Sequence, residues 1–166
     1  MVNCEVIKAK TVFADEIFLF FDTRTVTPGI CDLTGATISN AVAKICVLDC
    51  NVLCSNGLLT GTITFAICED FTIDDTPVEF FFRVTKPLTF QKADCTSIDL
   101  SGCTVSHLQC QIARVSANNT ITITSADTFE QTLDIEVKII IEAEKLLCVE
   151  LCKNTGVVTI VTPGLI

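Results

Sequence analysis

Hydrophobic and polar residues alternate over two long segments of the chain. The segment 59–67 alternates large apolar residues with threonines, and the segment 133–143 alternates apolar with mainly charged residues. A period of two over such lengths is typical of a β-strand with one buried face. The residues expected on the buried faces are Leu59, Ile63, Phe65, Ile67, Leu133, Ile135, Val137, Ile139 and Ile141.

Shorter apolar runs and turn residues extend this pattern along the chain. Asn56-Gly57 fits a tight hairpin with both residues at positive φ, and Asn118-Asn119 and Asn154-Thr155-Gly156 are similar turn signals. The segment 34–44 is ambiguous and could hold a short helix. Further strands are predicted at 78–84, 105–115, 121–123, 146–151 and 157–161.

These elements predict an all-β protein built as a single-domain β-sandwich. Strand spacing favours the Greek-key or jelly-roll type, with about nine to ten strands over residues 1–166. We find no internal repeat and no linker in the sequence. An N-terminal arm (1–12) is predicted to be available for assembly. The C-terminal strand (156–166) either pairs within its own domain, as the last strand of the sandwich, or adds to a neighbouring subunit. The C-terminal segment has no charged side chain, and an uncharged strand edge invites pairing with another chain.

The charge balance excludes several classes of partner. The chain has 11 basic and 20 acidic residues and a net charge of −9. A phosphate backbone or an anionic membrane surface is bound by clustered Lys and Arg, so neither nucleic acid nor a membrane is expected as a partner. The first residues lack the basic and apolar regions of a signal peptide, and no apolar run reaches membrane-spanning length.

The cysteines are the most unusual feature of the composition. Cys46, Cys50 and Cys54 would lie roughly 13 Å apart along one strand face, beyond the roughly 7 Å between Cα atoms that a disulfide allows. Each would therefore need a partner on another strand or another chain, as would Cys148 and Cys152. An odd count leaves at least one thiol over. The crosslink candidates are Cys4, Cys31, Cys46, Cys50, Cys54, Cys68, Cys95, Cys103, Cys110, Cys148 and Cys152.

No catalytic or cofactor site is predicted. The chain has no Cys-x2-Cys pair for a structural zinc site, and its one histidine, His107, is expected at the surface of a strand. Glu69-Asp70 and Asp74-Asp75 are interpreted as an acidic loop, although such oxygens could hold a hard cation. No glycine-rich phosphate-binding loop is present. We therefore expect no enzyme activity, no catalytic residues, no metal and no cofactor.

The stretch from about Ala43 to Leu151 carries a resemblance to a group of bacterial proteins. The features that carry it are a predicted strand-hairpin at 43–68, the sequence segments Val78 to Val84 and Pro87-Leu88-Thr89-Phe90, two predicted strands joined at Asn118-Asn119, and the long predicted strand 133–144. In these features it resembles domains of spore coat and exosporium proteins from spore-forming Firmicutes. The high cysteine content is similar to that of cysteine-rich spore-surface proteins that assemble into sheets or appendage fibres.

This resemblance implies a structural protein that assembles with itself. It would be made in the mother-cell cytoplasm without a signal peptide and crosslinked by disulfides on the spore surface, in the coat, exosporium or an appendage. Its partners would be copies of itself, as a homo-oligomer or polymer, and other spore-layer proteins. Cys4, close to a chain terminus, is the first candidate for an intermolecular bond. The alternatives are a surface- or carbohydrate-binding β-sandwich module and a thiol-rich metal-binding protein.

Overall fold

The chain folds into β-strands. The computed structural model describes residues 4–29, 32–92, 108–151 and 158–161, with side chains at 10, 12–29, 32–92 and 108–143. Most of the described residues lie in strands, which confirms the all-β prediction, and none of these residues forms a helix that could cross a membrane. The strands are β1 (Cys4–Val26), β2 (Ile38–Ser55), β3 (Leu58–Ile73), β4 (Thr76–Thr89), β5 (Leu108–Ile123), β6 (Phe129–Leu151) and β7 (Val158–Val161).

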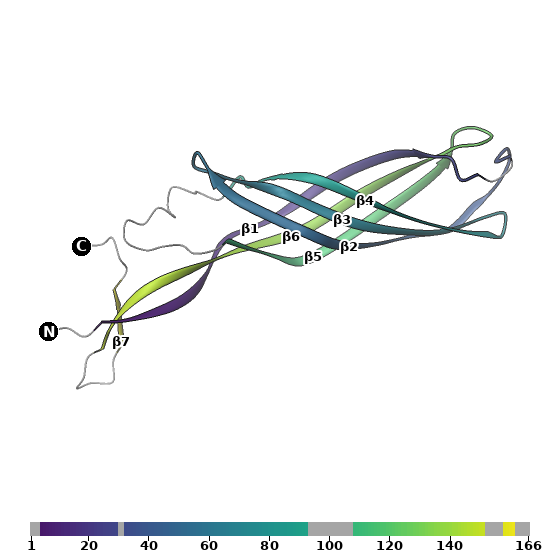
Figure 1. The fold of residues 1–166 in the computed structure, drawn as a ribbon. Helices are drawn as coiled ribbons and strands as arrows, with labels where there is room; N and C mark the ends of the chain where they lie inside the picture. The colour runs from purple at the N-terminus through teal and green to yellow at the C-terminus, as the bar shows by residue number, and fades with distance from the viewer. Residues whose placement is uncertain (1–3, 30–31, 93–107, 152–157, 162–166) are drawn as a thin grey trace.

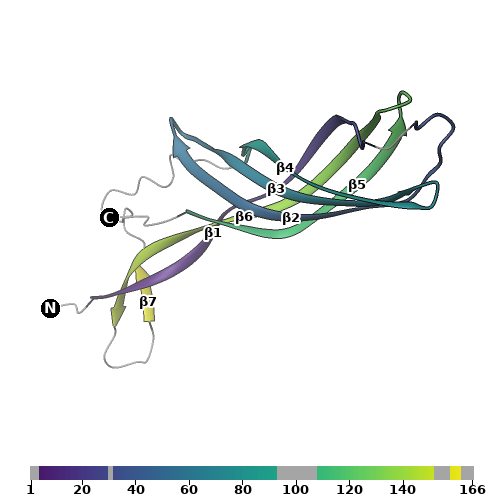
Figure 2. The same cartoon turned by 45° about the vertical axis from the view of Figure 1, so that its right-hand side comes forward.

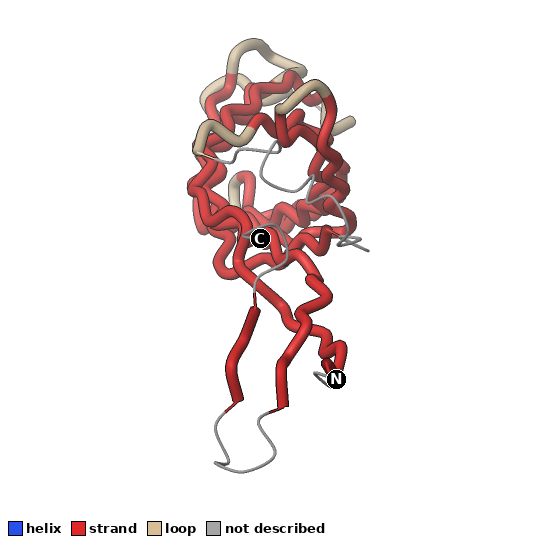
Figure 3. Tube along the Cα trace, turned by 90° about the vertical axis from the view of Figure 1, so that its left-hand side faces the viewer, coloured by secondary structure: helices blue, strands red, loops and turns tan. Residues whose placement is uncertain are grey.

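Two antiparallel sheets lie face to face (Figure 1). Sheet A has the order β1-β6-β5, and β7 pairs with β6 beyond the end of β5. Sheet B is the meander β2-β3-β4. The end view in Figure 3 shows the strands of both sheets arranged around the interior of this part of the molecule. We call this part of the molecule the two-layer body.

The core consists of the inward rows that the alternation predicts. All nine residues expected on the buried faces of segments 59–67 and 133–143 are at most 1% exposed. They belong to a large apolar cluster that takes side chains from both sheets. A smaller cluster at the other end of the two-layer body contains Leu33, Phe71, Ile73 and Phe129.

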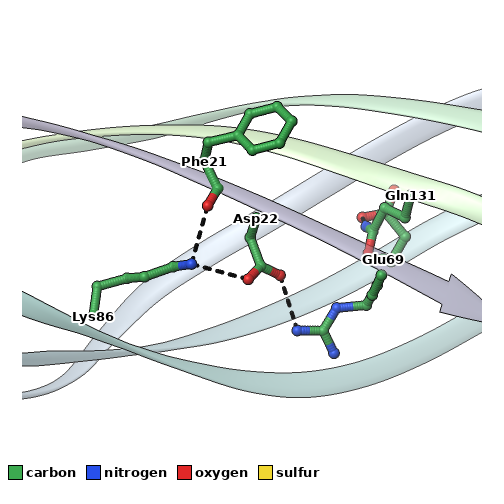
Figure 4. Close-up of polar contacts among 6 residues, drawn as sticks. Phe21, Asp22, Glu69, Lys86 and Gln131 are labelled. Atoms are coloured by element: carbon green, nitrogen blue, oxygen red, sulfur yellow. Dashed lines mark hydrogen bonds and ion pairs between the residues drawn. The ribbon is translucent and has the colours of Figure 1, made fainter.

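The two open seams between the sheets are closed by side chains. Along one seam, a disulfide joins β2 to β5. Along the other, Lys86 of β4 donates hydrogen bonds to the Phe21 carbonyl and the Asp22 carboxylate of β1, each 3.0 Å long (Figure 4). The Glu16 carboxylate of β1 accepts the backbone N–H groups of residues 91–92.

A narrow ribbon projects from the two-layer body. Figure 2 shows the first part of β1 and the last part of β6 leaving the body together, with β7 alongside β6. The expected N-terminal arm is part of a strand in the structure. From Cys4 to Val12 it forms the first part of β1 and pairs with residues 142–150 of β6. Within the expected C-terminal strand, Val158–Val161 forms β7 and pairs with residues 148–151 of its own chain.

Some predicted boundaries were wrong. Asn118-Asn119 is not a turn but lies inside β5, so segments 105–115 and 121–123 belong to one strand from Leu108 onward. Segment 146–151 is likewise the end of β6. The ambiguous segment 34–44 holds no helix, because Thr34-Gly35 is a turn and β2 begins at Ile38. The structure describes seven strands, so the expected nine to ten are not confirmed.

The tight turns follow from residues that tolerate positive φ. Asn56 and Gly57 have φ angles of 51° and 78° and connect β2 to β3, as predicted. Asp74 and Asp75 have φ angles of 47° and 66° and form the turn between β3 and β4. Asp74 also accepts the Thr37 backbone N–H at 2.8 Å. This acidic pair therefore shapes a turn, for which Asp is well suited.

Candidate functional site

Five of the eleven cysteines have described side chains, and they differ in their bonding. Cys50 of β2 forms a disulfide with Cys110 of β5, with 6.0 Å between the Cα atoms. Cys54 is also disulfide-bonded. Cys46 and Cys68 are free. The side chains of the other candidates lie outside the described residues: Cys4, Cys31, Cys95, Cys103, Cys148 and Cys152.

A β-bulge in β2 decides which cysteines face inward. The sequence prediction placed Cys46, Cys50 and Cys54 on one strand face. In the structure, the ladder between β2 and β3 shifts register between Val47 and Asp49, which leaves Leu48 as an extra residue. Because one extra residue reverses the side-chain alternation, Cys46 faces outward while Cys50 packs against the core. The prediction of a single face was wrong for Cys46.

The two free thiols lie on the outward face of sheet B. Cys46 is opposite Ala66, and Cys68, two residues further along β3, is opposite Lys44. Both cysteines line a shallow depression of about 150 Å³, together with Ala66 and Phe81. We call this surface, from Lys44 to Phe81 across β2, β3 and β4, the thiol face.

The surroundings of Cys68 keep its thiol protonated. Its Sγ donates to Glu79 at 3.6 Å, and Asp70 lies on the same face of β3. Desolvation, the hydrogen bond to Glu79 and the nearby carboxylates raise the pKa of the Cys68 thiol, which the Lys44 ammonium lowers only in part. A protonated thiol is a poor nucleophile. Cys68 is therefore disfavoured in thiol exchange.

The same three side chains are the described group that most resembles a metal site. Ligand atoms of Cys68, Asp70 and Glu79 lie within 4.8 Å of one another. Two features oppose metal binding here. Asp70 is already paired with Lys44 at 3.4 Å, and the raised pKa of Cys68 works against the thiolate that a metal requires.

The outward face of sheet A carries an apolar ridge. Ile17, Leu19 and Phe21 of β1 are 56%, 75% and 62% exposed, while Phe18 and Phe20 between them pack into the core. In a strand with one uncovered face, an uninterrupted apolar run exposes every second residue, so the run 17–21 was the sequence signal for this ridge. The ridge borders an open depression of about 370 Å³, whose polar lining residues are Ser116, Asn118, Asp134 and Glu136.

A polar group is buried between the sheets, where the sequence predicted a loop. Glu69 lies in β3 and is 0% exposed, so its assignment to an acidic surface loop was wrong. Asn119 of β5 and Gln131 of β6 both donate to its carboxylate. Figure 4 shows Glu69 beside Gln131, next to the contacts of Asp22 and Lys86. No motif in the sequence pointed to this cluster.

His107, expected at the surface of a strand, lies outside the described residues. In comparisons with protein-family models, with curated proteins and with solved structures, the chain matches none of them. The features of the described structure that bear on function are the thiol face, the apolar ridge and the buried polar group.

Proposed function

We propose that this protein is a structural building block that assembles with itself into a disulfide-crosslinked layer or fibre. The observation that carries the proposal is the division of its cysteines. Cys50 and Cys110 are paired at the seam between β2 and β5, and the exposed Cys54 is disulfide-bonded too, whereas Cys46 and Cys68 are free on one outward face. Paired inward cysteines stabilise the subunit, and outward free thiols are available to another chain.

Cys46 is the better candidate of the two for a bond between subunits. Disulfide exchange requires a thiolate with access to the partner sulfur. Cys46 is exposed, while Cys68 is half-buried and its pKa is raised. Cys4 stays a second candidate on the sequence argument alone.

Exposed apolar surface supports an assembling protein. Ile17, Leu19 and Phe21 form a contiguous ridge, and Phe81 is 60% exposed on the opposite sheet. Contiguous apolar patches on a protein surface mark interaction sites. Two such surfaces on opposite faces of one subunit would suit repeated contacts, which form open fibres or layers unless their rotation closes a ring.

The resemblance to spore coat, exosporium and appendage proteins supplies the proposed location. We place the assembled protein on the spore surface, after synthesis in the mother-cell cytoplasm. Disulfides form in oxidising surroundings, so crosslinking would follow exposure of the assembled layer. Other proteins of the same layer are proposed partners.

We further infer that the two sheets form a β-sandwich of Greek-key type. The consecutive hairpins of β2, β3 and β4 are followed by β5, which lies beside β2 at the seam of the Cys50–Cys110 bond. The spatial order β5-β2-β3-β4 is that of a Greek key. An experimental structure with β5 beside β4 would contradict this inference.

A surface- or carbohydrate-binding module is the second candidate, and one observation favours it. The depression beside Phe21 combines an exposed aromatic ring with the amide of Asn118 and the carboxylates of Asp134 and Glu136. Ligand sites usually combine apolar surface with a small number of precisely placed polar groups. Glycan-array binding that is lost in Phe21→Ala would support this candidate over the structural role.

The test of assembly compares two cysteine variants under air oxidation. We expect the wild-type protein to form a ladder of species on a non-reducing gel, which collapses to a single 18.0 kDa band on reduction. Cys46→Ser should weaken the ladder strongly, and Cys68→Ser, the matched control on the same face, should weaken it little. Negative-stain microscopy then separates fibres from layers. A wild-type protein that stays monomeric after oxidation would overturn the proposal.

A further inference from the structure

The buried carboxylate of Glu69 separates the two apolar clusters of the core. On β3, Ile67 packs in the large cluster and Phe71 in the small one, and Glu69 is the inward residue between them. On β6, Gln131 has the same place between Phe129 and Leu133. A polar layer therefore crosses the core where the two clusters meet.

The hydrogen bonds of this layer join the two sheets. Asn119 Nδ2 donates to one carboxylate oxygen of Glu69, and Gln131 Nε2 donates to the other at 2.5 Å. The amide oxygens of Asn119 and Gln131 are buried without a hydrogen-bond partner. An ionised carboxylate can only accept hydrogen bonds, so both amides turn their N–H groups toward Glu69 and leave their own oxygens unpaired. Each unpaired buried oxygen costs about 1–3 kcal/mol.

Protonation of Glu69 would remove part of this conflict. A carboxylic acid carries an O–H donor, and a side-chain amide that rotates by 180° presents its oxygen to that donor. One unsatisfied acceptor would then be paired while the N–H groups of the rotated amide lose the carboxylate, so the net gain is that no charge would be buried. The neutral acid therefore fits the layer better than the carboxylate does.

No cation offsets the charge of Glu69 in the described structure. Its neighbours in sheet B are Ala43 of β2 and Phe80 of β4, and the adjacent Asp70 adds a like charge. Of the outward charged residues, Lys44 pairs with Asp70 and Glu79 accepts from Cys68. From sheet A, the facing residues Asn119 and Gln131 are uncharged.

Two basic groups of the inward rows, Arg24 and Lys86, pair with Asp22, although the Nε of Arg24 is buried without a hydrogen-bond partner. Arg24 of β1, in register with Gln131, pairs with Asp22 at 3.0 Å and lies 3.5 Å from the centre of the Phe82 ring. Lys86 of β4 pairs with the same Asp22 at 3.0 Å. These groups form an ion-pair network at the β1–β4 seam and leave Glu69 to the two amides.

We propose that Glu69 is a proton-operated latch that holds the two sheets together at the end containing the small cluster. With Glu69 protonated, the polar layer is closed and the small cluster is packed. With Glu69 ionised, the buried charge favours separation of β3 from β5 and β6 at this end. The other end stays tethered, because the Cys50–Cys110 disulfide and the large cluster lie on that side of the layer.

The ionisation equilibrium supports this assignment and sets its pH range. Burial, the dominant cause, raises the pKa of Glu69 to about 7, although the bonds from Asn119 and Gln131 act in the opposite direction. The ordinary value is 4.5. The latch would therefore respond between these values, with the closed form favoured at the acidic end and opening favoured as the pH rises.

Hydrogen exchange, corrected for its intrinsic pH dependence, tests the latch. For peptides covering 68–73 and 118–131, we expect the opening constant of the wild-type protein to rise about 30-fold from pH 5.5 to 8.5. Glu69→Gln, which cannot ionise, should remove this rise. Glu79→Gln, an outward glutamate on the neighbouring strand, should keep it. An unchanged rise in Glu69→Gln would overturn the proposal.

A second measurement covers the case in which Glu69→Gln does not fold. The carboxyl carbon of Glu69 in the wild-type protein can be followed by NMR as the pH is raised. We expect its titration midpoint near neutral pH, together with exchange broadening of the Phe71 and Phe129 rings above it. A midpoint below pH 5, or rings of the small cluster that do not respond, would overturn the latch.

Discussion

Removal of the Cys50–Cys110 disulfide is expected to destabilise the fold mainly through the unfolded chain. The bond joins residues 60 positions apart, so it closes a long loop. In the chain-entropy description, a loop of this length lowers the entropy of the unfolded state by an amount equivalent to about 4 kcal/mol at 25 °C. The double variant Cys50→Ala/Cys110→Ala restores that entropy and leaves no buried unpaired polar group.

Urea unfolding under non-reducing conditions measures this effect. With an m value of about 2 kcal/mol per M, a loss of about 4 kcal/mol lowers the midpoint by about 2 M. The m value itself should rise, because an unfolded chain without the crosslink exposes more surface. Cys46→Ala is the matched control on the same strand. Its side chain is free and exposed, so a change within about 0.5 kcal/mol is expected.

Two results would refute the reasoning about this bond. A loss below about 1 kcal/mol with an unchanged m value would mean that the disulfide does not restrict the unfolded chain. An equal loss in Cys46→Ala would mean that the destabilisation comes from altered packing in β2. In either case the division into inward stabilising and outward crosslinking cysteines would lose its energetic basis.

Two further predictions concern β3. Gly61→Ala would place a Cβ 1.9 Å from the backbone oxygen of Asn51, so β2 and β3 must separate there. We expect thermal unfolding to show a loss of about 1–3 kcal/mol in the free energy of unfolding. The control Thr62→Ala, at the exposed neighbouring position, should change it little. The free energy of global unfolding should fall by about 3 kcal/mol from pH 4.5 to 7, because folding raises the pKa of Glu69 to about 7. A Glu69→Gln protein with the same pH dependence of stability would contradict this.

The strands could be predicted where burial alone decides the pattern. Segments 59–67 and 133–143 alternate because one face packs in the core and the other meets solvent. The failure at Asn118-Asn119 has a tertiary cause. Asn favours turns because its side chain bonds to the local backbone. The Asn119 amide instead donates to Glu69 across the core, so the residue remains in the strand.

The candidate site was harder to predict because it depends on register. Spacing alone placed Cys46 and Cys50 on the same face, and only the bulge at Leu48 separates them. A bulge depends on the partner strand, and no residue of β2 signals it. Glu69 was missed for a similar reason. Its alternation with Ile67 and Phe71 predicts an inward position, but a carboxylate there requires two amides from the other sheet, which single-strand patterns do not reveal.

The bulge and the polar layer together give the two ends of the body different roles. The bulge turns Cys50 inward, where its bond to Cys110 holds the sheets together beside the large cluster. At the other end, the described residues of the small cluster are held by noncovalent contacts and by the layer of Glu69. A subunit built in this way can open at one end without unfolding at the other, because the crosslink keeps the strands of the large cluster in register. If the proposed assembly is correct, the bulge also leaves Cys46 on the outward thiol face, so that crosslinking between subunits would not compete with the bond that holds each subunit together.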